Sequence, residues 1–184
     1  KSAPQYAKEF GYKIVADVSY AANATDVTSE VGALIKAKPD VLMHASYITD
    51  AILFTKTFKE MNFAPKGITT FAGYIEPAYL PAVKSDGNYI VIRSTFALDL
   101  AKGKPLVGQV SELFRKKYGL DMSENAARSF AAPFVLADAM NRAKSTNSED
   151  IVKALLQTDI PGDQMIYPWK GIKFDPKTHQ NIYA

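Results

Sequence analysis

The sequence has no cysteine, only two histidines, and no long hydrophobic run. Without cysteine the chain can form no disulfide, no zinc–thiolate site and no cysteine nucleophile. Its apolar runs are shorter than the ~20 residues that a membrane-spanning helix needs. The start, Lys1–Pro4, also lacks the apolar segment of a signal peptide. These absences exclude a disulfide scaffold and predict no transmembrane helix.

Catalytic and nucleotide-binding signatures are missing as well. There is no G-x-S-x-G elbow, no G-x-x-x-x-G-K-[ST] phosphate loop and no G-x-G-x-x-G after a strand. His44 lies in an apolar run and is expected to be a hydrogen-bonded core residue, whereas His179 is expected in a surface turn. The acidic residues that could serve as acid–base groups are spread along the chain: Asp17, Asp50, Glu76 and Asp138. We therefore expect no catalytic residue, no metal site and no cofactor.

The composition is that of a globular protein with one ordinary core. The chain has 184 residues, of which 47% are hydrophobic and 22% charged. Its net charge is +3, and the lysines are scattered rather than gathered on one segment. Nucleic-acid binders concentrate positive charge on one face, so no nucleic-acid partner is expected.

Strand and helix patterns alternate in the first part of the chain. Short β-branched runs predict strands at residues 12–18, 41–45, 68–71 and 89–94, and helical spacing lies between them. This alternation predicts an α/β fold with a doubly wound, mostly parallel sheet flanked by helices. After residue 105 the pattern becomes helical, with predicted helices at 106–118, 123–143 and after the capping box at 146–149, then a strand and turn from 171. We expect a ligand-binding lobe at residues 1–105 and a helical continuation with a returning strand at 106–184, packed on that lobe.

Two strand ends stand out as candidate binding loops. Ser46 and Tyr47 follow the strand at 41–45, and Ala72, Gly73 and Tyr74 follow the strand at 68–71. In open α/β sheets, ligands bind beyond the carboxyl ends of the strands. A glycine there lets a group approach the backbone closely, and a tyrosine offers a flat face with a polar tip. The alternative is that these are ordinary turn residues whose rings pack on a neighbouring helix.

A third candidate lies at residues 125–140, where a proline interrupts helical spacing. Pro133 cannot donate a hydrogen bond to the carbonyl of Ser129. Either the helix begins near Pro133, which is then a first-turn proline with Phe130 in the core, or the helix kinks and leaves a free carbonyl beside Arg128 and Phe130. The sequence leaves both alternatives open.

The chain resembles the type I periplasmic solute-binding proteins of branched-chain amino acid-type ABC importers. The resemblance runs over nearly the whole chain in the same order, and is carried by residues 21–66 (AANATDV…FAPK), 128–158 (RSFAAPFVLADAM…LLQT) and 171–181 (GIKFDPKTHQN). Members of that family have two α/β lobes that close on a small molecule. The resemblance implies a second-lobe fragment with the following helices, and a start inside a helix that ends at Gly11 fits this expectation.

The resemblance also implies which residues meet the ligand. Carried over, the family's second-lobe contacts fall on the same three places: Ser46 and Tyr47, then Ala72, Gly73 and Tyr74, then Phe130 with Arg128. Amino-acid binders tend to carry an acidic residue in the second loop, and here Glu76 comes later than that position. This departure leaves room for aromatic or other carboxylic acids, with the three rings meeting an apolar group and Arg128 meeting a carboxylate.

These implications predict a monomeric, non-enzymatic, periplasmic or otherwise extracytoplasmic binding protein. It would bind a small amino acid or an aromatic or organic carboxylic acid and deliver it to the membrane permease of an ABC transporter. Closure about a hinge would be favoured by ligand contacts to both lobes. The alternatives are a ligand-sensing regulatory module of the same fold and an α/β enzyme whose nucleophile lies outside this sequence.

Overall fold

The computed structural model describes residues 3–184, and the chain divides into two compact units between Arg93 and Ser94. The division comes earlier than the boundary expected after residue 105. The reason is that Phe96 is buried in the same apolar cluster as Val107 and Val110, so the connecting segment packs with the second unit. The two units are described separately below.

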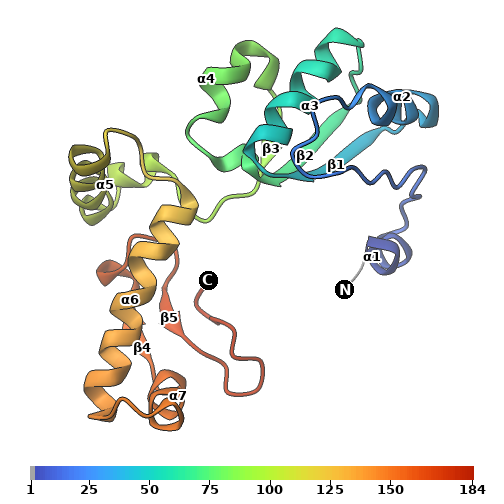
Figure 1. Cartoon of the computed structure of the whole chain (residues 1–184). Helices are drawn as coiled ribbons and strands as arrows, with labels where there is room; N and C mark the ends of the chain where they lie inside the picture. Colours follow the sequence, from blue (N-terminus) through green and yellow to red (C-terminus); the bar gives the residue numbers. More distant parts are fainter. Residues whose placement is uncertain (1–2) are drawn as a thin grey trace. The chain divides into compact units, whose positions relative to one another are not determined.

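The first unit is built on a parallel sheet with helices packed on it (Figure 1). Its strands pair in the order β1-β2-β3, and both pairs are parallel. The parallel α/β class expected from the alternating pattern is therefore confirmed. The elements of this unit are α1 (Ala3–Phe10), α2 (Thr28–Ala37), β1 (Val41–Ser46), α3 (Ile48–Glu60), β2 (Gly67–Ala72), the short 3₁₀ helices η1 (Gly73–Ile75) and η2 (Lys84–Gly87), α4 (Tyr79–Val83) and β3 (Val91–Ile92).

One face of this sheet carries the core of the unit. Exposure alternates along β1, so that Leu42, His44 and Ser46 are buried while Val41 and Met43 are exposed. The buried face packs against α2 and α3 through one cluster and against α3 and α4 through another. The period-2 pattern of β1 thus decides which side chains lie beneath the helices.

The strand predicted at Tyr12–Val18 does not form. Residues 12–20 have no regular secondary structure, although Ala16, Val18 and Tyr20 are partly buried against the α2–α3 cluster. A β-branched run becomes a strand only where a neighbouring backbone pairs with it. Among residues 3–184, β1 pairs with β2 alone, so this run has no strand partner.

The second unit is mostly helical. The helices predicted here form: Gly119 ends α5 with φ 73°, and Ser123 accepts from the amide of Ala126. At α7 the cap is Asn147, which accepts from the amide of Glu149, and not Thr146, the first residue of the predicted capping box. The antiparallel pair β4–β5 follows the helices. The elements are η3 (Leu98–Lys102), α5 (Pro105–Tyr118), α6 (Glu124–Ala143), α7 (Ser148–Leu156), β4 (Asp159–Pro161), η4 (Gly162–Gln164) and β5 (Gly171–Lys173).

Pro133 lies in the interior of α6, ten residues into a 20-residue helix that starts at Glu124. The alternative in which a helix begins near Pro133 is therefore wrong. Ser123 caps the helix a full two turns earlier, and buried Ala127 and Ala131 fix its first half against the core. The Ser129 carbonyl still loses its amide donor at Pro133.

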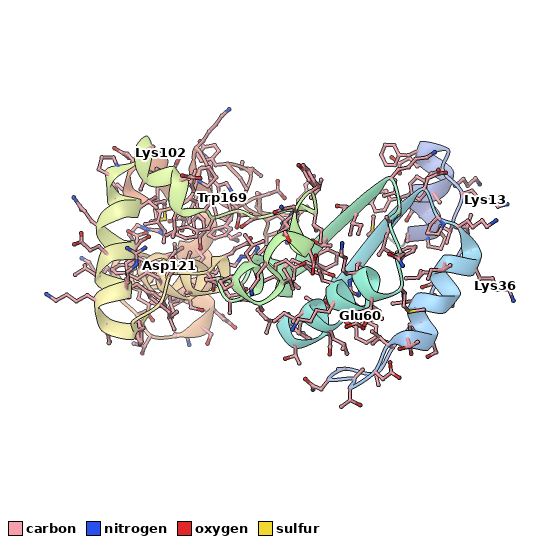
Figure 2. The ribbon with its side chains drawn as sticks, turned by 90° about the horizontal axis from the view of Figure 1, so that it is seen from above. Lys13, Lys36, Glu60, Lys102, Asp121 and Trp169 are labelled. Atoms are coloured by element: carbon pink, nitrogen blue, oxygen red, sulfur yellow. The ribbon has the colours of Figure 1, made fainter. Side chains whose placement is uncertain are left out.

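Charged side chains cover the outside of both units. Lys13, Lys36 and Lys102 extend away from the ribbon in Figure 2, and all three are exposed. In the part of the chain that the structure describes, every helix is too short or too polar to span a membrane.

Candidate functional site

The carboxyl ends of β1 and β2 lie side by side. Ser46, the last residue of β1, stands opposite Ala72, the last residue of β2. Tyr47 then precedes the first residue of α3, and Gly73 begins η1. The two loops picked out from the sequence are therefore neighbours at one edge of the sheet.

Gly73 packs against the backbone of the other loop. A methyl group on its α-carbon would overlap the carbonyl carbon of Tyr47 and the amide nitrogen of Ile48, and would lie 2.7 Å from Ile48 Cα. No side chain fits in that space. Glycine is required here because η1 touches the peptide that starts α3.

Ala72 has an unusual backbone conformation, with φ 63° and ψ −112°. Residues other than glycine rarely adopt this region, and the strain costs on the order of 1–3 kcal/mol. Such strain persists where the surrounding structure fixes the chain on both sides. Strained residues cluster at ligand-binding sites, which makes this bend a candidate for function.

Ser46 and Tyr47 point in different directions. Ser46 is 6% exposed, and its hydroxyl lies near the hydroxyls of Tyr20 and Tyr74. Tyr47 is 76% exposed, although it adjoins the buried core of α3. A large aromatic side chain so exposed at the carboxyl edge of a parallel sheet is well placed to contact a small molecule.

Tyr74 does not offer a face to solvent, and that expectation is corrected. It is 2% exposed and lies in a cluster with Ala51, Tyr79 and Val83 beneath α3 and α4. Burial raises the pKa of its hydroxyl, which lies 2.6 Å from His44 Nδ1. The ring turns inward because this buried histidine supplies the partner that a buried tyrosine hydroxyl needs.

His44 is the hydrogen-bonded core residue that the sequence predicted. It is 9% exposed, and its ring is edge-on to Phe54 with the centroids 4.5 Å apart. Burial lowers its pKa to about 4, although the charge of Asp50 opposes the shift, so His44 is neutral at pH 7. His179, by contrast, is exposed in a turn, as expected.

Asp50 is a polar residue of this region that the sequence reasoning left among scattered acids. It lies in the first turn of α3, is 1% exposed, and accepts a hydrogen bond from the Asn23 amide at 3.3 Å. It therefore fastens the loop at Asn23 to the start of α3, close to Tyr47. Its place in the first turn of a helix, where acids are favoured, was the available signal.

Arg128 lies on α6 in the second unit and is paired with a carboxylate. Glu124, one turn earlier and 2% exposed, forms an ion pair with the Arg128 guanidinium. Burial alone would raise the pKa of Glu124, but hydrogen bonds from Ser94 and Thr95 together with the charge of Arg128 lower it. The Arg128 side chain remains 51% exposed, so only part of its donor set is occupied.

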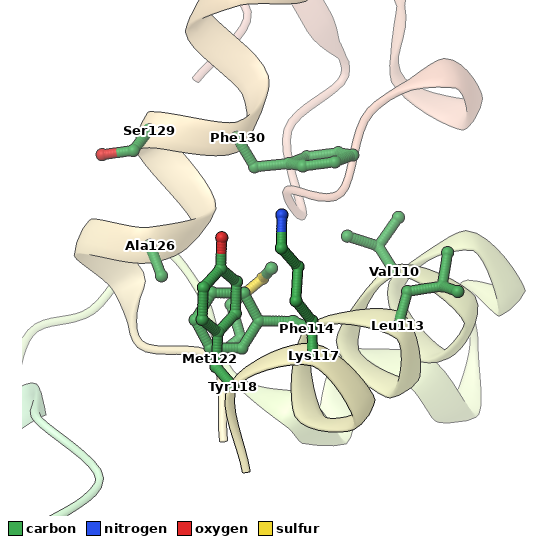
Figure 3. A pocket seen from close by; sticks show the side chains of 9 residues that line it. All are labelled: Val110, Leu113, Phe114, Lys117, Tyr118, Met122, Ala126, Ser129 and Phe130. Carbon is green, nitrogen blue, oxygen red and sulfur yellow. The ribbon is translucent and has the colours of Figure 1, made fainter. Parts of the chain in front are cut away.

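Phe130 borders a hollow of the second unit. A pocket of about 380 Å³ lies between α5 and α6, lined by Val110, Phe114 and Met122 among others. Figure 3 shows the Phe130 ring reaching over this pocket, with the Lys117 side chain pointing towards it. Residues two apart on a helix point in different directions, so Phe130 and Arg128 serve different faces of α6.

The sequence matches the periplasmic binding protein family over residues 1–184, and the chain belongs to this family. The Leu/Ile/Val-binding protein homolog 7 of Brucella suis is 29% identical over 189 residues, covering 100% of this chain and 47% of that protein. Homolog 8 of Brucella abortus is 27% identical over 183 residues, covering 97% of this chain and 45% of that protein. The chain thus spans about half the length of the curated relatives it matches.

Solved structures of the same fold agree. A leucine-binding protein from Thermotoga maritima has a TM-score of 0.76 at 19% identity, covering 94% of this chain and 47% of that one. The leucine-, isoleucine-, valine-, threonine- and alanine-binding protein of Brucella ovis, in its closed conformation, has a TM-score of 0.78 at 18% identity, with 96% and 44% covered. The resemblance to type I periplasmic binding proteins and the α/β fold class are confirmed; at these identities the structures show the fold alone.

Proposed function

We propose that this chain is part of the extracytoplasmic solute-binding component of an ABC importer, and that it binds a small amino acid or an aromatic or organic carboxylic acid. Two observations support the proposal. The chain belongs to the periplasmic binding protein family, and its relatives are named for binding leucine, isoleucine and valine. The exposed Tyr47 ring at the carboxyl edge of the sheet carries the assignment of the site.

Tyr47 exposes a larger fraction of its surface than Phe130 or Ser46. Its ring supplies an apolar face for an aliphatic or aromatic group, and its hydroxyl can donate to a carboxylate or accept from an ammonium group. Ser46, directly before it, is buried, and its hydroxyl lies near those of Tyr20 and Tyr74. The backbone of Ala72 and Gly73 forms the adjoining wall.

Arg128 and Phe130, which lie on α6, remain proposed ligand-contact residues of the second unit. The guanidinium of Arg128 shares its charge with Glu124, so it would hold a ligand carboxylate less strongly than an unpaired arginine. Phe130 would add apolar surface. We rank both below Tyr47 because Arg128 is already paired with Glu124 and the Phe130 ring already contacts the Phe134 ring.

On this proposal, delivery of the ligand to the permease depends on closure of the two lobes that are typical of the family. Ligand contacts to both lobes favour the closed form, which a membrane permease can distinguish from the open form. On this proposal the protein works as a monomer in the periplasm or an equivalent extracytoplasmic space. On this proposal, binding and release of the ligand involve no covalent chemistry.

The test is calorimetric titration of the full-length protein with L-leucine, L-isoleucine, L-valine, L-phenylalanine and benzoate. We expect at least one of these to bind and to raise the melting temperature. Tyr47→Ala should weaken that binding about tenfold or more, because it removes a large contact surface.

The matched control is Tyr89→Ala. Tyr89 is 97% exposed and precedes β3, so it lies at the amino edge of the same sheet. Its loss should leave the dissociation constant within about twofold. The proposal fails if none of the five compounds binds, or if the Tyr47 and Tyr89 variants bind equally well.

A further inference from the structure

His44 and Tyr74 form a buried polar pair that none of the proposed ligand contacts uses. Nδ1 of His44 and the Tyr74 hydroxyl are 2.6 Å apart, and both side chains are almost fully buried. The rings of Phe54 and Tyr79 surround the pair, with centroids 4.5 Å from His44 and 4.8 Å from Tyr74. The charge of Asp50 also acts on His44, and Thr55 lies near the Tyr74 hydroxyl. Because both partners are buried, water competes little with the hydrogen bond between them.

This pair joins the two segments that carry the proposed site. His44 lies three residues before Tyr47, and Tyr74 directly follows Gly73. Gly73 in turn lies against the peptide between Tyr47 and Ile48. The end of β1 and the start of η1 are therefore held together at two points, one polar and one by close packing.

Backbone pairing alone does not set this arrangement. The β1–β2 ladder ends at Ser46 and Ala72, just before Tyr47 and Gly73. Beyond the ladder the chain turns at Ala72 through a strained conformation. A strained residue needs contacts on both sides to hold it, and on the far side the first side-chain hydrogen bond is that of Tyr74.

We propose that His44 and Tyr74 are positioning residues for ligand binding. Their hydrogen bond holds Gly73 against the Tyr47–Ile48 peptide and so fixes where the Tyr47 ring meets the ligand. Tyr74 thus acts through the backbone of the other loop rather than by touching the ligand. This inference rests on the proposed function, because it assigns the placement of the same contact.

The test compares two buried tyrosines that lose the same atom. Tyr74→Phe keeps the ring and removes the hydroxyl. Tyr79→Phe makes the same change in the same cluster, where the hydroxyl lies 2.8 Å from Thr55 Oγ1. In the full-length protein, titrated with L-leucine, L-phenylalanine and benzoate, Tyr74→Phe should weaken binding about fivefold or more, and Tyr79→Phe by less than about twofold.

A double-mutant cycle separates positioning from general stability. If Tyr74 acts through Tyr47, then Tyr74→Phe should have no further effect on affinity in the Tyr47→Ala background. Equal effects in both backgrounds, or equal effects of Tyr74→Phe and Tyr79→Phe, would overturn the inference. If Tyr47→Ala leaves binding unchanged, the proposed function is wrong. If Tyr47→Ala weakens binding but Tyr74→Phe leaves it unchanged, only the positioning role of Tyr74 is wrong.

His44 supplies a second test should Tyr74→Phe fail to fold. His44→Asn retains a polar group near the position of Nδ1, whereas His44→Leu removes it. Positioning predicts affinity within about twofold of the parent for His44→Asn and about fivefold weaker binding for His44→Leu. Equal affinities for the two variants would contradict the proposal.

Discussion

The hydroxyl of Ser94 lies 2.7 Å from the carboxylate of Glu124, at the point where the second unit begins. The same carboxylate oxygen accepts a hydrogen bond from the Thr95 amide at 2.9 Å. Glu124 is 2% exposed and also pairs with Arg128. One buried acid therefore fastens the segment that connects the two units to the first turn of α6.

Glu124→Gln should destabilise the protein by roughly 1–3 kcal/mol, because a neutral amide weakens three contacts made by a buried carboxylate. Asp138→Asn is the matched control: it lies on the same helix, also pairs with an arginine four residues on, and is 42% exposed. It should cost under about 0.5 kcal/mol. Urea unfolding of both variants measures the difference, and equal midpoints would show that Glu124 does not fasten the segment.

Gly73→Ala should destabilise the protein by roughly 1–3 kcal/mol, because the new methyl group overlaps the backbone of Tyr47 and Ile48. Gly32→Ala in α2 should have the opposite sign. A methyl group there meets only Met61 Cε at 4.0 Å, and alanine favours a helix interior by roughly 0.5–1 kcal/mol. Thermal melting of the two variants checks the prediction. A Gly73 variant as stable as the parent would refute the close approach.

Ala72→Gly should be tolerated better than Ala45→Gly. Glycine adopts the φ of 63° at position 72 without strain, whereas Ala45 lies within strand β1, where glycine only adds flexibility to the unfolded chain. We expect the difference in unfolding free energy to be about 1 kcal/mol or more in favour of the residue 72 variant. Equal stabilities in chemical denaturation would mean that residue 72 is unstrained.

Acid should destabilise the first unit through His44. Burial lowers its pKa from 6.5 to about 4, so the folded state favours the neutral ring. The stabilisation that the neutral ring gives to the folded state is complete above pH 6.5 and is lost as the pH falls towards 4. At pH 5 the free energy of unfolding should be lower by about 2 kcal/mol. Unfolding free energies measured between pH 7.5 and 5 should therefore decrease, and His44→Asn should flatten that decrease.

The titration has a direct check. If the decrease in unfolding free energy between pH 7.5 and 5 survives in His44→Asn, His44 is not the group responsible.

Local patterns predicted much of the fold. The helices at 105–118 and 124–143 follow from apolar spacing and from caps at Ser123 and Gly119, all of which are encoded within a few residues. The parallel strands β1 and β2 followed from short apolar runs between helices. The strand at 12–18 failed because a strand depends on a partner elsewhere in the chain, which local sequence does not reveal.

The sequence predicted that the two strand-end loops are neighbours at one edge of the sheet, but not the direction of each side chain. Tyr47 and Tyr74 both follow a strand, yet one is 76% and the other 2% exposed. The difference comes from His44, which offers a buried partner to Tyr74 and none to Tyr47. A lone histidine within an apolar strand was the signal, because a buried imidazole requires a hydrogen-bonding partner from another segment.

The most direct test is a crystal structure of the full-length protein with whichever of the five probe compounds binds most tightly. The account predicts that the ligand lies in van der Waals contact with the Tyr47 ring, beside the backbone of Ala72 and Gly73, while Tyr74 stays buried on His44. A ligand bound elsewhere, with Tyr47 still exposed to solvent, would contradict it.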